Sequence, residues 1–542
     1  MKKLFRISPA RGGRSSTVFS WQAEGNYLAT AGSSNLVSIY NRHGERVDEI
    51  TLTGSGAVLS LEWDREGEFL AVLQDENGQI PIWERATRKV AHLETNLRDP
   101  TFLKWSKAGP QLAIGTQKGN LMVFNRSTKK KIPVLAKHPR AITCGAWSSS
   151  NKLCLGSDDR TMTLSNAVGD TLSQTDLKFP PHALQFTTPA GGGEEDSCVS
   201  INMGGKSLLL YHLDAPDTPV ELSFEPDYGN IVAHAWFGPG HLLVGFSRGQ
   251  VVALNTSDSA VSEELWSQRV HAESLYGLAY SPALQRCATA GDSGVKIIDM
   301  TRGAFRELPD EAITMDTSDD GRPHMISWSP DGQILTVSTR SGYVYNFLAK
   351  MPMIHARFGT TVAYLSSLRE ISVLSTRGGE RPVVVQTALE PTFAGLGGGH
   401  VAAGMNNRIL YYRAQQDDMS KVAEQEYLGS VEAVCLNDRF AAVLSDSQVT
   451  LHLIENVKGG GPQRRTFPDR EDAAGKSVTC LALTENFLVY GTSKGTVEFF
   501  YLTEWAMLAG TELRHEREIK AIYPNEQGTR VVVVDENGEG FM

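Results

Sequence analysis

The stretch KHPRAITCGAWSSSNKLCLGSDDRTMTLSN, residues 137–166, decides the fold. It holds three short runs with strand composition, separated by tight polar turns, at residues 142–147, 153–157 and 161–166. In the first run, the alternate residues Ile142, Cys144 and Ala146 share one face of a strand. These runs predict an antiparallel up-and-down sheet. One sheet of that size cannot bury a useful core alone, so the pattern is expected to recur along the chain.

The pattern does recur, with a constant spacing. Four tryptophans stand 42 residues apart, namely Trp21, Trp63, Trp105 and Trp147. Each of the first three is followed four residues later by glycine and seven residues later by leucine, in the texts WQAEGNYLATAG, WDREGEFLAVLQ and WSKAGPQLAIGT. A fixed period of about 40 to 45 residues, with several short strands per unit, is typical of β-propeller blades. Chance spacing of four tryptophans does not explain glycine and leucine at matching positions.

The composition is that of an ordinary globular protein. Of the 542 residues, 41% are hydrophobic and 21% are charged, and the 51 glycines lie mostly between strand-like runs. The net charge of −10 is dispersed, which argues against broad nucleic-acid binding through phosphate neutralisation. The six scattered cysteines have no zinc-ligand spacing and indicate small buried side chains in a reducing compartment. No secretory signal and no membrane-spanning stretch is read, so a cytosolic location is expected.

A change in composition divides the repeats into two domains. Seven blade-like units precede an acidic, turn-rich segment at residues 303–323. The motif then restarts at residues 325–349, and six blades are recognisable from there on. The sequence therefore predicts an all-β protein of two tandem WD40-type β-propellers, a seven-bladed one over residues 1–310 and a six-bladed, incomplete one over residues 311–542.

The two ends of the chain add two expectations. Residues 3–8, KLFRIS, form a strand-like segment ahead of the first full repeat. Propellers commonly close when an N-terminal strand completes the last blade, and we expect this segment to do so. The last residues, GEGFM, read as the opening of a strand. We therefore expect the chain to end inside a blade and to be a fragment of a longer protein.

The blade signature of the WD40 type joins four side chains by hydrogen bonds: a histidine, a serine or threonine, a turn aspartate and a tryptophan. Within residues 137–166, His138, Ser157 and Asp159 occupy three of these positions, while Ser165 stands at the tryptophan position. We expect His138 and Asp159 to be structural, because buried polar groups in such turns need partners.

No residue pattern predicts chemistry, and no catalytic, cofactor-binding or metal-binding residue is named. The GKS triplets at residues 205–207 and 475–477 lack the upstream glycine and the helix of a phosphate-binding loop, and residues 395–400 lack the last glycine of a dinucleotide fingerprint. The carboxylate pairs Asp319–Asp320 and Asp417–Asp418 are interpreted as solvated loops. The basic run Lys129–Lys131 is interpreted as a solvated strand edge, with contact to an acidic partner or a lipid surface as the alternative.

Several stretches together resemble a known family, the large WD-repeat subunits of intraflagellar transport complex A. The resemblance spans essentially the whole chain and is therefore more specific than a general WD signature. The stretches that carry it are IYNRHGERVDEI (39–50), GTQKGNLMVFN (115–125), KIPVLAKHPRAITCGAW (131–147), GNIVAHAWFGPG (229–240), VAAGMNNR (401–408), EYLGSV (426–431), LHLIE (451–455) and LVYGTSKG (488–495).

The resemblance implies two tandem N-terminal propellers, followed in the family by a helical tetratricopeptide solenoid. It also implies a scaffold role in retrograde ciliary transport, cilium assembly and the trafficking of ciliary membrane proteins. The partners it implies are the other WD-repeat/tetratricopeptide subunits of the complex, with ciliary membrane cargo or its adaptors as further partners. The location it implies is the cilium or flagellum, the ciliary base and the cytoskeleton-associated cytoplasm. It supplies no catalytic residue and no cofactor.

The leading hypothesis is therefore a non-enzymatic scaffold that presents its loops to neighbouring subunits or cargo. A vesicle-coat subunit with tandem propellers is the first alternative, and ciliary rather than Golgi location separates the two. A propeller enzyme is the second alternative, because fold alone does not determine function. It would need acids, histidines or metal ligands that converge at a central funnel.

Overall fold

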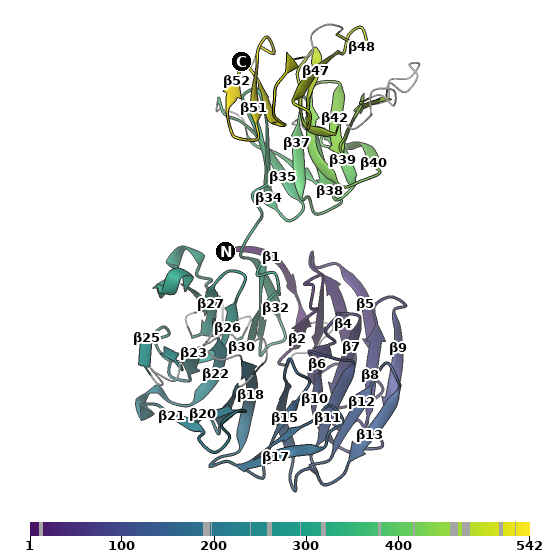
Figure 1. Cartoon of the computed structure of the whole chain (residues 1–542). Helices are drawn as coiled ribbons and strands as arrows, with labels where there is room; N and C mark the ends of the chain where they lie inside the picture. Colours follow the sequence, from purple (N-terminus) through teal and green to yellow (C-terminus); the bar gives the residue numbers. More distant parts are fainter. Residues whose placement is uncertain are drawn as a thin grey trace. The chain divides into compact units, whose positions relative to one another are not determined.

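The computed structural model describes residues 1–9, 15–187, 196, 198–238, 240–256, 263–292, 294–315, 321–377, 381–415, 418–455, 464–468, 477–508, 513–525 and 527–542. This part of the chain consists of short antiparallel β-strands joined by turns, with single-turn 3-10 helices at Pro226–Tyr228, Thr301–Gly303 and Pro309–Glu311. The strands gather into two compact units, Met1–Lys350 and Met351–Met542 (Figure 1). The prediction of an all-β fold is confirmed.

The first unit contains eight four-stranded sheets, numbered here as blades 1 to 8. Blades 1 and 2 are β2 (Val18–Trp21), β3 (Tyr27–Ala31), β4 (Leu36–Asn41), β5 (Arg46–Thr51), and β6 (Val58–Trp63), β7 (Phe69–Gln74), β8 (Gln79–Glu84), β9 (Lys89–Glu94). Blades 3 and 4 are β10 (Pro100–Trp105), β11 (Gln111–Thr116), β12 (Leu121–Asn125), β13 (Lys130–Val134), and β14 (Ile142–Trp147), β15 (Leu153–Ser157), β16 (Thr161–Ser165), β17 (Thr171–Asp176).

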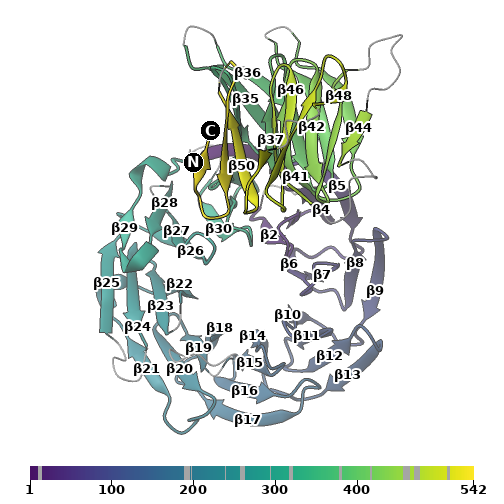
Figure 2. The same cartoon turned by 45° about the horizontal axis from the view of Figure 1, so that its top comes forward.

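The remaining four blades complete a ring. Blades 5 and 6 are β18 (Pro181–Thr187), β19 (Cys198–Met203), β20 (Ser207–His212), β21 (Val220–Ser223), and β22 (Ile231–Trp236), β23 (His241–Phe246), β24 (Gln250–Asn255), β25 (Glu263–Arg269). Blades 7 and 8 are β26 (Leu275–Ser281), β27 (Arg286–Gly291), β28 (Gly294–Asp299), β29 (Arg306–Glu307), and β30 (Pro323–Trp328), β31 (Ile334–Thr339), β32 (Val344–Leu348), β1 (Lys2–Ile7). Figure 2 looks into this ring, with β6, β10, β14, β18, β22 and β26 toward its middle.

The N-terminal strand closes the ring, as expected from residues 3–8. Strand β1 pairs antiparallel with β32, so that Lys2 lies opposite Leu348 and Ile7 opposite Val344. It thereby becomes the outermost strand of blade 8, although it is the first strand of the chain. Blade 8 thus joins the two ends of the unit.

The second unit contains five sheets in its described residues. The first three are β33 (His355–Phe358), β34 (Thr361–Ser367), β35 (Glu370–Ser375), β36 (Val383–Gln386); β37 (Phe393–Leu396), β38 (His400–Met405), β39 (Arg408–Arg413), β40 (Lys421–Glu426); and β41 (Val431–Leu436), β42 (Phe440–Ser445), β43 (Gln448–Leu453), β44 (Arg464–Phe467). The last two are β45 (Val478–Leu483), β46 (Phe487–Thr492), β47 (Thr496–Tyr501), β48 (Ala506–Met507), β49 (Leu513–Arg514); and β50 (Ile519–Pro524), β51 (Val531–Asp535), β52 (Gly540–Phe541).

Two sequence-based predictions of the domain layout are wrong. The first unit has eight sheets rather than seven blades, and it extends to Lys350 rather than to residue 310. The unit predicted at 325–349 belongs to this ring as blade 8, which leaves five sheets rather than six in the second unit. The acidic segment misled the prediction because part of it is structural: β29 pairs with β28, and buried Ile313 packs between blades 7 and 8.

The burial of each strand follows its place in the blade. Middle strands such as β7 are buried on both faces, because each sheet of the first unit packs between two neighbouring sheets. The outermost strands face solvent, and β9, with the text KVAHLE, is mostly exposed. The apolar clusters of the first unit accordingly lie between successive blades, as in the cluster of Ala29, Ile39, Trp63 and Leu70 between blades 1 and 2.

Candidate functional site

Periodic tryptophans join neighbouring blades by hydrogen bonds. The indole N–H of Trp63 donates to the Ser20 carbonyl oxygen of blade 1 at 3.2 Å, and that of Trp147 donates to the Lys104 carbonyl oxygen of blade 3 at 3.1 Å. Trp328 binds the Ala279 carbonyl oxygen of blade 7 in the same way, at 3.1 Å. Each of these three tryptophans therefore binds the backbone of the blade before it from the same position of its own blade.

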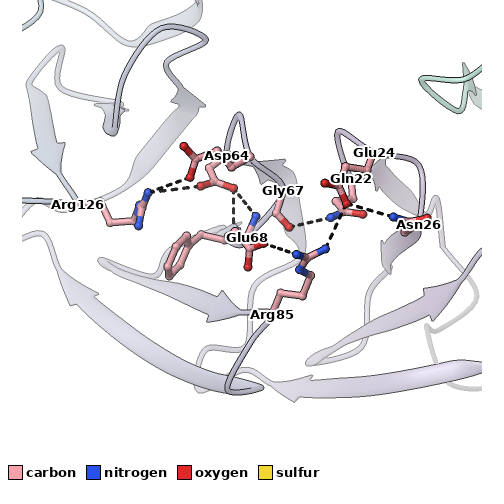
Figure 3. A network of polar contacts seen from close by, with 10 residues as sticks. Gln22, Glu24, Asn26, Asp64, Gly67, Glu68, Arg85 and Arg126 are labelled. Atoms are coloured by element: carbon pink, nitrogen blue, oxygen red, sulfur yellow. Dashed lines mark hydrogen bonds and ion pairs between the residues drawn. The ribbon is translucent and has the colours of Figure 1, made fainter. Parts of the chain in front are cut away.

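On one rim of the ring, a series of charged side chains joins blades 1, 2 and 3 (Figure 3). Arg85, directly after the third strand of blade 2, reaches Glu24 of blade 1 at 3.3 Å and also pairs with Glu68 of its own blade. Arg126, at the matching place in blade 3, lies 3.8 Å from both Asp64 and Glu66 of blade 2. Its guanidinium also lies over the Phe69 ring, 4.1 Å from the ring centre.

The third bridge of this kind crosses the ring closure. Arg42 of blade 1 donates to Asp331 and Gln333 of blade 8, both at 2.8 Å. The acids Glu24, Glu66 and Asp331 all stand three residues after a blade tryptophan, and the arginines all follow the third strand. This pairing could have been predicted from the sequence, because the acidic residue after the tryptophan and the arginine after the third strand both repeat at fixed positions. Each exposed bridge contributes about 0.2 to 1 kcal/mol, so three of them in succession fasten one arc of the ring.

The polar network predicted in residues 137–166 is present with a different set of partners. His138 Nδ1 lies 3.0 Å from Asp159 Oδ2, and His138 Nε2 lies 3.0 Å from the Thr163 hydroxyl. Ser157 does not join the ring nitrogens; its hydroxyl bonds the Arg140 carbonyl oxygen and the Asp159 backbone N–H. Burial lowers the pKa of His138, opposed by the neighbouring Asp159 carboxylate. His138 and Asp159 therefore join two loops of blade 4, which agrees with a structural role.

Two further buried histidines were missed by the sequence analysis. His234 of blade 6 lies 3.0 Å from the Ser200 hydroxyl of blade 5, which also accepts the indole N–H of Trp236. His271 lies 3.0 Å from the Thr289 hydroxyl. Burial lowers the pKa of both imidazoles to about 4, so both are neutral at physiological pH. Each holds neighbouring strands together and has no solvent access for chemistry.

In the second unit, one ion cluster bridges neighbouring sheets. Arg413 donates to both carboxylate oxygens of Glu455, at 2.9 and 2.7 Å, and to Asp418 at 2.9 Å. His400 lies 2.8 Å from Glu455. The bidentate arginine, followed by the histidine, lowers the pKa of Glu455 to about 2. These ion pairs join the sheets β37–β40 and β41–β44. Here the acid, Glu455, belongs to the later sheet, whereas in the first unit the acid belongs to the earlier blade.

A buried hydrogen-bond chain crosses the same pair of sheets. His452 Nδ1 lies 2.8 Å from the Leu453 carbonyl oxygen, so Nδ1 carries the proton and Nε2 accepts. Tyr427 donates to Nε2 at 2.8 Å, and Tyr411 lies 2.9 Å from the Tyr427 hydroxyl. Burial raises the pKa of Tyr427 to about 12, so the chain stays neutral. It orients three side chains and leaves no group free to react.

The other motifs weighed in the sequence occupy structural positions. Gly205 and Lys206 lie in the turn between β19 and β20, and Ser207 begins β20; the Lys206 ammonium lies 4.7 Å from the Phe179 ring centre. Residues 397–399 form the turn between β37 and β38. Lys130 and Lys131 begin the outer strand β13, where Lys131 donates to the Glu94 carbonyl oxygen at 2.7 Å. Asp319, Asp320, Asp417 and most of the second GKS triplet lie outside the described residues.

Neither metal-binding clusters nor reactive thiols emerge from the described ranges. No group of three or more His, Cys, Asp or Glu side chains there could hold a metal ion. Burial raises the pKa of the Cys144 and Cys198 thiols to about 12, which removes the thiolate needed for reactivity. No helix among the described residues is long and apolar enough to span a membrane.

Two β-sheet units, blades fastened by periodic tryptophans and buried His–Asp pairs in the loops define a class: the chain is a tandem β-propeller protein of the WD-repeat type. Family models described as the WDR19 first and second β-propellers match residues 17–342 and 362–542. The chain therefore belongs to the WDR19 propeller family, whose members are scaffold proteins rather than a class of enzymes.

Curated relatives agree with this assignment. WD repeat-containing protein 19 of Mus musculus and of Homo sapiens are 38% and 37% identical over 100% of this chain, and dyf-2 of Caenorhabditis elegans is 29% identical over 99%. The chain spans 40% of the length of each of these relatives. The intraflagellar transport protein 122 homolog of Xenopus tropicalis is 22% identical over 29% of this chain and 14% of its own.

One solved structure shares the fold. The computationally designed Ika8 protein resembles the chain with a TM-score of 0.52 and 15% sequence identity. The likeness covers 64% of this chain and 100% of the designed one. At this identity it concerns the fold alone.

Proposed function

We propose that the protein is a non-enzymatic scaffold subunit of intraflagellar transport complex A. The observation that carries this proposal is the match of both propellers to the WDR19 family over nearly the whole chain. The weaker likeness to an intraflagellar transport protein 122 homolog supports a shared assembly. In this role the protein acts in retrograde ciliary transport, cilium assembly and the trafficking of ciliary membrane proteins.

The geometry of the described residues suits a rigid platform. Tryptophans, arginine bridges and buried histidines join neighbouring blades to one another. Their polar groups are occupied by these contacts. The turns on both rims then remain for partners. The partners we propose are the other WD-repeat/tetratricopeptide subunits, with ciliary membrane cargo or its adaptors, and the proposed location is the cilium and its base.

Affinity purification from ciliated cells tests the proposal. A tagged copy of this chain, and in parallel the full-length protein, should retain other subunits of the complex. An unrelated WD-repeat propeller with the same tag is the control. Failure of both the chain and the full-length protein to retain any subunit would overturn the assignment.

Fluorescence microscopy separates the ciliary role from the vesicle-coat alternative. The tagged full-length protein should concentrate at the ciliary base and along the axoneme. Concentration on Golgi membranes instead would favour a coat subunit with tandem propellers. The two outcomes exclude each other because the two assemblies act on different membranes.

A further inference from the structure

Among the described residues, the interface between blades 8 and 1 is the least apolar in the first propeller. Its apolar cluster has three buried side chains, Phe19, Leu28 and Val344. The clusters at the other seven interfaces contain between eight and twelve buried side chains each. Since apolar burial is the main favourable term in blade packing, this seam is held least strongly by it.

The cause is a set of polar side chains at positions that are apolar in blades 1, 2 and 7. In blades 1, 2 and 7 the middle of the second strand pairs an alanine with an isoleucine of the third strand: Ala29–Ile39, Ala71–Ile82 and Ala288–Ile297. Each of these pairs packs against the next blade. In blade 8 the matching pair is Thr336–Asn346, and Ser338 stands where blade 7 has Ala290.

These polar side chains are fully buried and only partly satisfied. Thr336 accepts the indole N–H of Trp21 at 2.9 Å and donates to Asn346 Oδ1 at 2.7 Å. Asn346 Nδ2 and Ser338 Oγ have no hydrogen-bond partner among the described residues, although both side chains are 0% exposed. A buried polar atom without a partner destabilises the packed state relative to an opened, hydrated one.

The remaining contacts across the seam are also polar. They include the Thr17 bond to the Gly342 carbonyl oxygen at 3.2 Å, the Arg42–Asp331 bridge at 2.8 Å and the Arg42 bond to Gln333 at 2.8 Å. The antiparallel ladder between β1 and β32 supplies the backbone pairing between strands β30 to β32 and the N-terminal part of the chain. Water and salt compete directly with contacts of this kind, as they do not with an apolar interface.

We propose that the first propeller opens at this seam, with β30 to β32 separating from β1 and blade 1 while the other seven interfaces stay packed. Opening requires the smallest loss of apolar burial and hydrates Asn346 and Ser338. Blade 8 continues at Lys350 directly into the second unit. Its release therefore changes the freedom of that connection without unfolding the ring.

Hydrogen–deuterium exchange of the whole chain, read by mass spectrometry, tests the proposal. Amides of β1, β31 and β32 should exchange at least about tenfold faster than those of the matching strands of blade 3, namely β13, β11 and β12, because local opening sets exchange in a stable sheet. The excess should grow with salt, since the Arg42–Asp331 bridge is screened. Equal protection of all eight blades would overturn the proposal.

The double substitution Thr336→Ala with Asn346→Ile gives the seam the pair found in blades 1, 2 and 7. It should slow exchange of β1 and β32 by about tenfold and leave β11 and β12 unchanged. The indole of Trp21 loses an acceptor, but it is partly exposed, and Trp105 already lacks a partner at the interface of blades 2 and 3. Equal slowing in every blade, or no slowing at the seam, would contradict the proposal.

The reverse double substitution, Ala288→Thr with Ile297→Asn, is the matched control at the interface of blades 7 and 8. It places the same polar pair in an apolar cluster and should transfer fast exchange to β26 through β31. Should this variant not fold, the wild-type pattern and the seam variant still decide the question.

Discussion

At the residue scale, the buried polar side chains are occupied in holding strands together. His234 is 4% exposed, and its Nε2 meets the hydroxyl of Ser200, which in turn accepts from Trp236. Burial is the cause that lowers its pKa from 6.5 to about 4. The folded protein thus keeps a neutral imidazole where the unfolded chain would take up a proton.

This difference makes stability depend on pH in a defined window. Below pH 6.5 the unfolded chain binds a proton at His234 that the folded chain does not, until the pH reaches about 4. Stability is therefore lost on acidification through this window, by up to about 3 kcal/mol from this group. His234→Gln should remove that part of the slope, as measured by urea unfolding at several pH values.

The exposed His355→Gln is the control for that experiment and should leave the slope as in wild type. The difference in unfolding free energy between wild type and His234→Gln should fall steadily from pH 6.5 to 4. A difference that does not change with pH would show that His234 is not the titrating group.

At the element scale, the outer strand of blade 8 depends on one glycine of blade 1. Gly44 has a φ of +86°, and a Cβ built on it would lie 2.5 Å from the Phe5 ring of β1. Residues other than glycine are strained at such a φ, and here a Cβ would also collide with the Phe5 side chain. A side chain at this position would therefore force Phe5 of β1 to move.

Gly44→Ala should destabilise the protein by more than backbone strain alone. Gly303→Ala is the matched control, because Gly303 has a φ of +73° but nothing within 4 Å of its Cβ. We expect about 1 kcal/mol for the control and a further 1 to 3 kcal/mol for Gly44→Ala, from overpacking against Phe5. The measurement is the midpoint of urea unfolding. Equal losses in both variants would mean that the Phe5 contact does not matter.

At the scale of the whole molecule, the first propeller ends where blade 8 ends. A chain that stops at Lys350 contains all eight blades, and one that stops at residue 310 lacks β30 to β32. The shorter chain exposes the faces of blades 7 and 1 and leaves β1 without a partner. We expect cooperative thermal unfolding, followed by circular dichroism, for 1–350 and a broad or absent transition for 1–310. A cooperative transition for 1–310 would favour the seven-bladed ring.

Much of this architecture could be predicted from the sequence, for a physical reason. Trp21, Trp63 and Trp147 each bind the preceding blade, and together with Trp105 they mark the first four blades at a constant spacing. Strand positions such as 142–147 and 153–157 followed from alternation and turns. The division of the blades between the two units did not, because the acidic segment at residues 303–323 has the composition of a domain boundary although β29 pairs with β28 there. Partners such as Ser200 for His234, or Glu455 for Arg413, are set by packing across sheets, which no local pattern encodes.

The closure of blade 8 by β1 also sets an order of events in time. Strand β1 leaves the ribosome before its partner β32, which ends 341 residues after Ile7. At synthesis rates of roughly 5 to 20 residues per second, β1 waits about 20 to 70 s before that partner exists. During this interval its exposed backbone edge could pair wrongly, and Lys2, Lys3 and Arg6 oppose such pairing by their charge. The positive charges of β1 thus suit a strand that pairs with its partner only after the rest of the ring has been made.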